Sequence, residues 1–485
     1  MKILVIGLDG ATPELLFGDE RLDNFRRLME AGCYGRLETV IPPHRIPAWM
    51  CMATGQDPGS LGTWGLHKLT DRSHNNLELV NSKPISELPI WSQIAREGKQ
   101  TCLIGVPLWY PPQERKGVWV SCPLPHKEIY TYPASVNEQI RKLTGSYPVD
   151  VRLSHPDKRD QFKDEIYTMS RKHFQVVRYF LQNTDWDYFQ FVEIGLDRLQ
   201  HNFWRFHDPY HPFHEPDNPY REVIRDYYLY LDHELGTILD LLDEETIILV
   251  VSCYGAQRLE GGFCLNEWLV KEGLLVLKEY PTKRVPFCQL QVNWEKTQVW
   301  SEGGYSARLF FNVKGREPQG ILSQANYEKL RDEIRMKLES LVDPQGKSLE
   351  AVVLKPDEIY TKVSPGTPDL IVQFGGLSWR IVDSVGNQTL YLPKSHPYLD
   401  DCNHGPFGSF ILAVPNNPFR GEIENIHLLD LAPTLLELGG YSVPPSMQGK
   451  SLLTKKVLKA AANEGFSAEE EEILRERLSG LGYIG

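Results

Sequence analysis

Six short apolar runs constrain the fold of this chain most, because runs of this kind indicate buried strands. They are rich in Val, Ile and Leu and show little alternation with polar residues, which is typical of strands covered on both faces. The runs are ILVIGL (3–8), TCLIGV (101–106), YFQFVEIG (188–195), TIILVVS (246–252), DLIVQF (369–374) and SFILAV (409–414). Amphipathic helical stretches lie between them, at 222–243, 325–341 and 427–438. We therefore predict an α/β fold with a doubly wound, mostly parallel sheet.

The strand signal fades in two regions, which we expect to form insertions over the carboxyl ends of the core strands. In open α/β sheets the ligand crevice lies outside those ends, so such insertions tend to wall it. The serine and acidic residues that open 467–485 predict a helix in the tail. The expected division is core (1–65), insertion (66–185), core (186–280), second insertion (281–360), core (361–455) and tail helix (456–485).

Charge and composition exclude several classes of protein. The net charge of −12 argues against a broad nucleic-acid-binding surface, although a local cationic pocket remains compatible with it. No apolar run approaches the roughly 20 residues that a membrane span needs. The opening MKILVIGLDG lacks the long apolar region of a signal peptide, so we expect a mature, cytoplasmic N-terminus. The eight cysteines are scattered without a CxxC pair, and we expect them to be reduced.

Two carboxylates follow predicted strands, where they would point into the crevice. Asp9 follows the strand in VIGLDG, and oxygen ligands of this kind suit divalent cations; an Asp-Gly turn is the simpler interpretation. Asp197 and His201 follow another strand in EIGLDRLQHNFW. Four-residue spacing on a helix puts both side chains on one face, within reach of one metal ion. An incidental histidine at a solvated helix start is the alternative.

Two further segments end or begin at predicted strands. His404, in DCNHGPFGSFILAVP, could complete a two-His, one-Asp metal site with Asp197 and His201, or could serve only as a turn residue. Cys253 follows the strand 246–252 and could be a soft ligand or a thiolate, although a buried inert cysteine is the simpler interpretation.

Taken together, these segments resemble the alkaline phosphatase superfamily, in its type I phosphodiesterase/nucleotide pyrophosphatase branch. LVIGLDGATPELL resembles the strand with the first metal aspartate, and PPHRIPAWMCMATGQDPGSLG resembles the nucleophile segment, normally P-x-T-x-P-A-W. EIGLDRLQHNFW, VVSCYGAQ, HGPFGSFILAVP and LLDLAPTLLELGGYSVPPSMQGKSL resemble later motifs in the family order. The resemblance implies an alkaline-phosphatase-like core with cap insertions. It also implies two metal ions and a threonine or serine nucleophile between them.

This sequence departs from the family pattern on one side of the implied site. Asp197, His201 and His404 match one metal site in full. At the other, Asp9 is present, but the Asp and His of the D-H-G motif are Cys253 and Tyr254. The threonine position holds Arg45, and the His of the usual H-G after the nucleophile helix is Leu61.

Arg45 cannot be deprotonated to attack phosphorus, but it can grip a phosphate or carboxylate with two donors. We therefore expect it to replace a cation, to pair with Asp9 and to bind anions. Zinc needs about three protein ligands, so we expect one divalent metal, zinc by its ligand set with manganese or iron as alternatives, and no second metal.

Two hypotheses from different classes follow from these departures. In one, the chain is a non-hydrolytic relative that binds a phosphate-type or other anionic small molecule, without nucleic-acid or membrane partners. In the other, it is a metal-dependent hydrolase, transferase or lyase of altered mechanism, acting on a phosphorylated or sulfated small molecule. A third interpretation makes Cys253 the nucleophile, although its position matches a ligand of the family.

Overall fold

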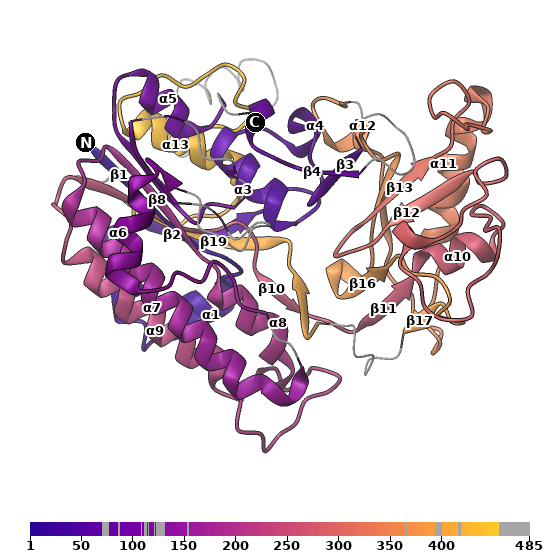
Figure 1. The fold of residues 1–485 in the computed structure, drawn as a ribbon, viewed down its shortest axis with the longest axis horizontal. Coiled ribbons are helices and arrows are strands. Elements are labelled where there is room, and N and C mark those ends of the chain that lie inside the picture. The colour runs from indigo at the N-terminus through magenta and orange to yellow at the C-terminus, as the bar shows by residue number, and fades with distance from the viewer. Residues whose placement is uncertain are drawn as a thin grey trace, which may run out of the picture.

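The computed structural model describes residues 1–454 apart from residues 70–76, 86–87, 108, 111–113, 115, 121, 123–130, 153–154, 365, 393–399 and 416–418. The chain forms a large lobe around one sheet and a second, smaller lobe beside it (Figure 1). The predicted tail helix, 456–485, lies outside the described residues. No helix in the described ranges is long and apolar enough to cross a membrane.

The large lobe is organised by a ten-stranded sheet with the order β20-β2-β19-β9-β1-β8-β5-β6-β7, in which β21 also pairs with β2. The pairs at its centre, β9–β1, β1–β8, β8–β5 and β5–β6, are parallel, whereas β19 runs antiparallel to both β9 and β2. The strands are β1 (Lys2–Leu8), β2 (Cys33–Glu38), β5 (Thr101–Ile104), β6 (Gly117–Val120), β7 (Thr131–Tyr132), β8 (Tyr188–Glu193), β9 (Thr246–Ser252), β19 (Phe407–Ala413), β20 (Gly421–Glu422) and β21 (Ile426–His427). The predicted α/β fold with a mostly parallel sheet is confirmed.

Helices cover both faces of this sheet (Figure 1). One layer contains α1 (Pro13–Gly18), α2 (Asp23–Ala31), α6 (Ser135–Thr144), α7 (Arg159–Asn183), α8 (Gly195–His207) and α9 (Val223–Leu239). The other contains α3 (Arg45–Thr54), α4 (Pro58–Leu61), α5 (Ile90–Arg96) and α13 (Leu431–Leu438). Because both faces are covered, the central strands are apolar at nearly every position.

The second lobe has a hydrophobic core of its own, built mainly from residues 263–381. Its two sheets have the orders β12-β13-β15-β14 and β16-β11-β17. The strands are β11 (Gly261–Cys264), β12 (Val299–Glu302), β13 (Ala307–Phe311), β14 (Val352–Leu354), β15 (Leu370–Gln373), β16 (Trp379–Val382) and β17 (Tyr391–Leu392), and the helices are α10 (Leu265–Lys271), α11 (Gln324–Glu339) and α12 (Pro356–Ile359). Two further small antiparallel pairs are β3 (His67–Leu69) with β4 (Leu77–Leu79), and β10 (Ala256–Arg258) with β18 (Cys402–His404).

One strand prediction is wrong in its placement. The run 369–374 forms a buried strand, β15, but β15 lies antiparallel between β13 and β14 in the second lobe and not in the central sheet. A run buried on both faces looks the same in either sheet. Conversely, residues 66–185, expected to lie over the sheet, supply its strands β5, β6 and β7. β5 lies in the run 101–106, which the sequence does predict as a strand, whereas β6 and β7 are only four and two residues long and the polar, proline-rich sequence around them hides the core signal.

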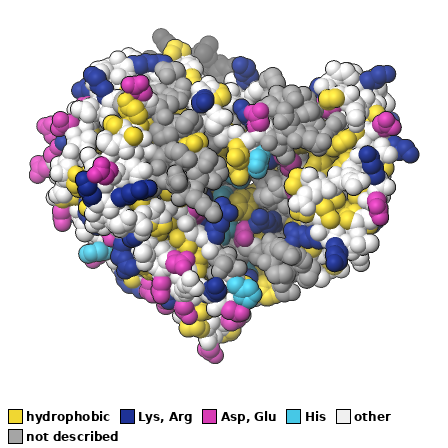
Figure 2. All heavy atoms as spheres, in the orientation of Figure 1, with side chains coloured by type: hydrophobic (Ala, Val, Ile, Leu, Met, Phe, Trp, Pro, Cys, Tyr) yellow, Lys and Arg dark blue, Asp and Glu magenta, His cyan; other side chains and the backbone are white. Residues whose placement is uncertain are grey.

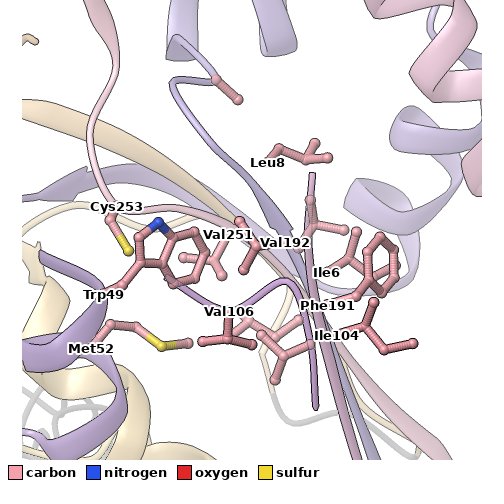
Figure 3. Close-up of a cluster of buried hydrophobic side chains, with 14 of the residues drawn as sticks. Ile6, Leu8, Trp49, Met52, Ile104, Val106, Phe191, Val192, Val251 and Cys253 are labelled. Carbon is pink, nitrogen blue, oxygen red and sulfur yellow. The ribbon is translucent and has the colours of Figure 1, made fainter. Parts of the chain in front are cut away.

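An apolar cluster lies at the centre of the sheet (Figure 3). Trp49 of α3 lies over β1, where a Cβ on Gly7 would come within 2.5 Å of the indole. A glycine is therefore required at this point of β1 for the helix to approach. Cys253, which follows β9, lies beside the same indole (Figure 3). The packing fixes the first turn of α3 above the carboxyl ends of the strands.

Candidate functional site

Three parallel strands deliver their carboxyl ends to one edge of the sheet. Leu8 pairs with Glu193 and Gly7 with Val251, so the residues that follow β1, β8 and β9 meet there. Asp9 follows β1, α8 starts directly after β8, and Tyr254 follows β9. His404 comes from β18, whose pairing with β10 places it opposite Ala256. The expected convergence of Asp9, Asp197 and His404 is present.

The start of α8 is held by a residue that the sequence did not indicate, Glu193. Its carboxylate accepts hydrogen bonds from the backbone N–H of Gly195 (2.7 Å) and Leu196 (3.2 Å), and from the hydroxyls of Ser170 (2.9 Å) and Tyr227 (2.7 Å). Burial raises the pKa of Glu193, while these donors oppose that shift. Unpaired N–H groups at a helix start attract a carboxylate. The cap therefore fixes the helix that carries both Asp197 and His201.

Asp197, His201 and His404 form a compact group of potential metal ligands. One ligand atom from each lies within 4.8 Å of the other two, and all three side chains are buried. Asp197 Oδ1 is 3.5 Å from His201 Nε2 and 3.4 Å from His404 Nε2. The four-residue spacing thus places carboxylate and imidazole together, as expected. Two imidazole nitrogens and one carboxylate oxygen are a donor set that suits zinc.

The outer nitrogens of the two imidazoles face acceptors. His404 Nδ1 is 2.7 Å from the carbonyl oxygen of Pro43, and His201 Nδ1 is 3.5 Å from Asp400 Oδ2. Such partners orient metal-ligating histidines with Nε2 towards the ion. Burial lowers the pKa of His404 below its ordinary value. Burial would also lower the pKa of His201, but Cys402, Tyr305 and Asp197 raise it well above that value.

Arg45 lies at the first position of α3 and bridges two carboxylates. Its Nε pairs with Asp9 Oδ2 and its Nη2 with Asp197 Oδ2. The Arg45 side chain is 14% exposed, whereas those of Asp9 and Asp197 are 0% and 3% exposed. Burial would raise the pKa of Asp197, but Arg45 and His201 hold it well below its ordinary range. The expected Arg45–Asp9 pair is confirmed, and the second contact joins it to Asp197.

The remaining hydrogen bonds of Asp9 come from aromatic side chains. Tyr254 Oη donates to Asp9 Oδ1 at 2.7 Å, and Trp49 Nε1 donates to the same oxygen at 3.0 Å. The Tyr254 ring stacks on His404 with centroids 3.8 Å apart, and its hydroxyl is 3.4 Å from Asp197 Oδ1. Tyr254 therefore joins Asp9 to the Asp197 group by hydrogen bonding and stacking.

Cys253 and Leu61 face apolar surroundings. Cys253 is fully buried beside Trp49 (Figure 3), and burial together with nearby Asp9 raises the pKa of its thiol. Leu61 packs against the main hydrophobic core. A thiol in such surroundings is protonated and a poor nucleophile, which favours the inert interpretation of Cys253.

The second lobe contributes Tyr305, which no sequence pattern indicated. Its hydroxyl is 3.3 Å from His201 Nε2, and its ring lies 4.1 Å from the His404 ring. Burial raises the pKa of Tyr305 to about 12, although His201 opposes the shift. The loop between β12 and β13 thus covers the two imidazoles. Figure 2 shows Lys or Arg and His side chains gathered where the surface is hollowed between the lobes.

Among the described residues, four arginines on segments that carry or adjoin the group each pair with an acidic side chain. The pairs are Arg45 with Asp9 and Asp197, Arg198 with Asp150, Arg308 with Glu302, and Arg380 with Asp400. The positive charge of these side chains is therefore largely balanced within the protein.

The sequence matches the family model described as type I phosphodiesterase / nucleotide pyrophosphatase over residues 3–405. The chain belongs to this family. Its members fall in the alkaline phosphatase superfamily, as the resemblance of the motifs predicted. A search of curated proteins finds no matching sequence.

Solved structures of the family share its fold. Human ectonucleotide pyrophosphatase/phosphodiesterase 5 is 14% identical, with a TM-score of 0.54 over 94% of this chain and 98% of that one. An inactive variant of the murine protein, in complex with AMP, is 16% identical, with a TM-score of 0.55 over 94% of this chain and 99% of the other. At this low sequence identity, the likeness shows only that this chain shares the fold of those proteins.

Proposed function

We propose that this family member binds one divalent metal through Asp197, His201 and His404, and an anionic, phosphate-type small molecule at that metal. We also propose that it has neither a second metal nor the usual nucleophile. The main support for both proposals is that the two oxygens of the Asp197 carboxylate have different partners. Oδ1 faces both imidazole Nε2 atoms, whereas Oδ2 pairs with Arg45, which also pairs with Asp9.

The donor set supports the metal assignment. Two imidazoles with Nε2 atoms beside one carboxylate oxygen are a common zinc arrangement, and three protein ligands leave a position for a further ligand. Zinc is our first choice for this donor set. Imidazole also binds other transition metals, whereas cations that prefer oxygen ligands alone suit the set less well. A bound divalent ion would supply positive charge for an anionic oxygen.

Arg45 supports the absence of a second ion. A guanidinium between Asp9 and Asp197 supplies the charge that a metal would otherwise bring, and it cannot lose a proton to become a nucleophile. Tyr254 and Trp49 use Asp9 Oδ1. We assign Arg45 as the fixed positive charge beside Asp9, in place of a second ion, and as a neighbour of the bound anion.

The pairing of these arginines predicts that binding of the anion depends on the metal. Because Arg45, Arg198, Arg308 and Arg380 all have acidic partners, the metal supplies the charge that is not already balanced. The murine relative was solved with AMP, so AMP and inorganic phosphate are suitable probes. Both should bind the metal-loaded protein and lose affinity when a chelator removes the ion.

The test is elemental analysis of the wild type, His404→Ala and the control His207→Ala, which lies at the end of α8 outside the metal group. We expect about one equivalent of metal in the wild type and the control and a large loss in His404→Ala. Metal absent from the wild type, even when supplied during purification, would overturn the assignment. About two equivalents would overturn the single-metal assignment.

The second candidate is an enzyme of altered mechanism, a hydrolase, transferase or lyase acting on a phosphorylated or sulfated small molecule. The three converging ligands are compatible with it as well, because a metal held by three protein ligands has a position left for water or substrate. Turnover of a chromogenic phosphodiester, phosphomonoester or sulfate ester that requires metal and disappears in His404→Ala would support it. Phosphodiester turnover through a phosphorylated side chain would contradict our main proposal.

A further inference from the structure

Tyr305 is held over the metal group by a loop with little freedom. Gly304 exchanges two backbone hydrogen bonds with Ile381 of β16, at 2.8 and 2.9 Å. Its φ of 137° favours glycine, and a Cβ on Gly303 would come within 2.5 Å of the Ile381 carbonyl oxygen. The two glycines therefore let the β12–β13 loop lie directly on β16 and project the next residue, Tyr305, towards the large lobe.

The Tyr305 ring is clamped between the two lobes. It stacks on the His201 ring at an interplanar angle of 21°, with centroids 5.7 Å apart. The Arg380 guanidinium lies 5.5 Å from the centroid of the Tyr305 ring and pairs with Asp400, which faces His201 Nδ1. These contacts fix the phenol in the position from which its oxygen meets His201 Nε2.

The spacing of the polar atoms is that of neighbouring corners in a tetrahedral site. Zinc–ligand bonds of about 2.0–2.1 Å imply ligand–ligand distances of roughly 3.3–3.4 Å. Asp197 Oδ1 is 3.5 Å from His201 Nε2 and 3.4 Å from His404 Nε2. Tyr305 Oη is 3.3 Å from His201 Nε2. A three-ligand set leaves one corner, and the distance from the phenol oxygen to His201 Nε2 is that of a neighbouring corner.

Simple hydrogen bonding between Tyr305 and His201 is incompatible with metal at the same nitrogen. While Nε2 binds an ion, it can neither accept the phenol proton nor donate a proton of its own. Metal binding would thus remove the partner of the partly buried Tyr305 hydroxyl, which is unfavourable when nothing replaces it. Coordination of the phenol oxygen to the ion removes that cost.

We propose that Tyr305 is the fourth protein ligand of the metal held by Asp197, His201 and His404, supplied by the second lobe. This rests on the metal site proposed above. The phenol proton passes to solvent as the oxygen binds, and inorganic phosphate displaces the phenol when it occupies the ion. The second lobe thereby contributes directly to metal affinity and sets a competition with the anionic ligand.

The test compares Tyr305→Phe, which keeps the ring and removes the oxygen, with Tyr391→Phe as a control. Tyr391 lies in the same lobe, and its hydroxyl donates to the Val342 carbonyl, away from the metal group. Zinc affinity is measured by competition with a chromogenic chelator. We expect Tyr305→Phe to weaken it at least about tenfold, since even the loss of an outer-shell partner of a ligand costs about 10–100-fold, and Tyr391→Phe to leave it unchanged.

A second measurement detects the bond itself. Iron(III) bound to a phenol oxygen has a visible charge-transfer absorption, which should occur in the wild type and Tyr391→Phe, be absent in Tyr305→Phe and fade on titration with inorganic phosphate. Equal or tighter zinc binding in Tyr305→Phe, without an absorption difference, would leave only a hydrogen bond and overturn the proposal. In that case about one equivalent of metal in the wild type would still support the proposed function. A wild type without metal would overturn both.

Discussion

Asp9 and Asp197 lie next to each other at the carboxyl edge of the sheet, yet their carboxylates have different surroundings. Asp9 accepts hydrogen bonds from Tyr254 and Trp49 on one oxygen and pairs with Arg45 through the other. Asp197 also pairs with Arg45, but its second oxygen faces two imidazoles. One half of the site is occupied by groups of the protein itself, whereas the other half presents donors for an ion.

The contrast indicates that Arg45, Tyr254 and Cys253 act together in the first half. Arg45 supplies a charge, Tyr254 supplies a hydrogen bond to Asp9, and Cys253 is small and apolar enough to lie against Trp49. Removal of any one of these side chains would leave a buried carboxylate without a partner or a cavity beside Trp49. The contact between Arg45 and Asp197 also couples the two halves. A substitution in one half should therefore have a measurable effect on the other.

The largest expected effect is the loss of stability in Arg45→Met. This change keeps an apolar stem and removes the charge that balances the fully buried Asp9, and breaking a buried pair costs about 3–5 kcal/mol. Urea denaturation of the metal-free protein measures it. The control is Arg36→Met, because Arg36 pairs with Glu14 at the surface, where both side chains are more than half exposed and loss costs less than about 1 kcal/mol. Similar small losses of stability in both variants would mean that Arg45 does not balance the buried carboxylates, and would contradict the coupling of the halves.

The next effect concerns the other half and its positioning residue, Asp400. Asp400→Asn removes the charge that faces His201 Nδ1 and should weaken zinc affinity about 10–100-fold, as loss of such a partner does elsewhere. Chelator competition measures the affinity, and urea denaturation should change far less than in Arg45→Met. Asp332→Asn, at an exposed position of α11, is the control. Unchanged affinity in Asp400→Asn would mean that His201 is oriented by its other contacts.

The fold was predictable where burial leaves a direct trace in the sequence. Runs such as 3–8 and 246–252 are apolar throughout because helices cover both faces of β1 and β9. The same reasoning could not assign 369–374 to its sheet, since β15 is equally buried in the second lobe. Strand pairing depends on distant partners, and a single run contains no record of them.

The site was predictable only where its residues are close in sequence or replace a motif position. The spacing of Asp197 and His201 predicts their common face, and the charge at Arg45 predicts its pairing with Asp9. Tyr305 and Asp400 reach the same histidine from segments more than 100 residues away. Neither lies in a pattern that would indicate this, because the contact depends on how the second lobe rests on the first.

A smaller effect should come from His44, which caps α3 immediately before Arg45 through a 3.3 Å hydrogen bond from the Ile46 N–H. Burial, His404, Arg308 and Arg45 lower the pKa of His44 to about 3, below about 6.5 in an unfolded chain. Between these values only the unfolded state binds the proton. The free energy of unfolding should therefore fall as pH decreases through this window.

His44→Asn should remove part of that pH dependence while keeping a capping oxygen. We expect the metal-free wild type to lose about 1 kcal/mol more than the variant between pH 6 and pH 5, against a limit of about 1.4 kcal/mol per pH unit. His155→Asn is the control, because exposed His155 caps a short helix in the same way. Parallel stability profiles for wild type and His44→Asn would contradict a neutral His44 beside Arg45.

The smallest effect is expected for Cys253→Ala, which tests whether this residue belongs to either half. Removing one buried sulfur should cost about 1 kcal/mol through the cavity it leaves, and metal content should be unchanged because no ligand is lost. A thiol reagent should modify exposed Cys288 in the folded protein and reach Cys253 only on unfolding, since the latter is buried and its pKa is raised. Loss of metal in Cys253→Ala, or rapid modification of Cys253 in the folded protein, would make the thiol a functional group. The first half would then hold a donor of its own, and the contrast between the halves would have to be abandoned.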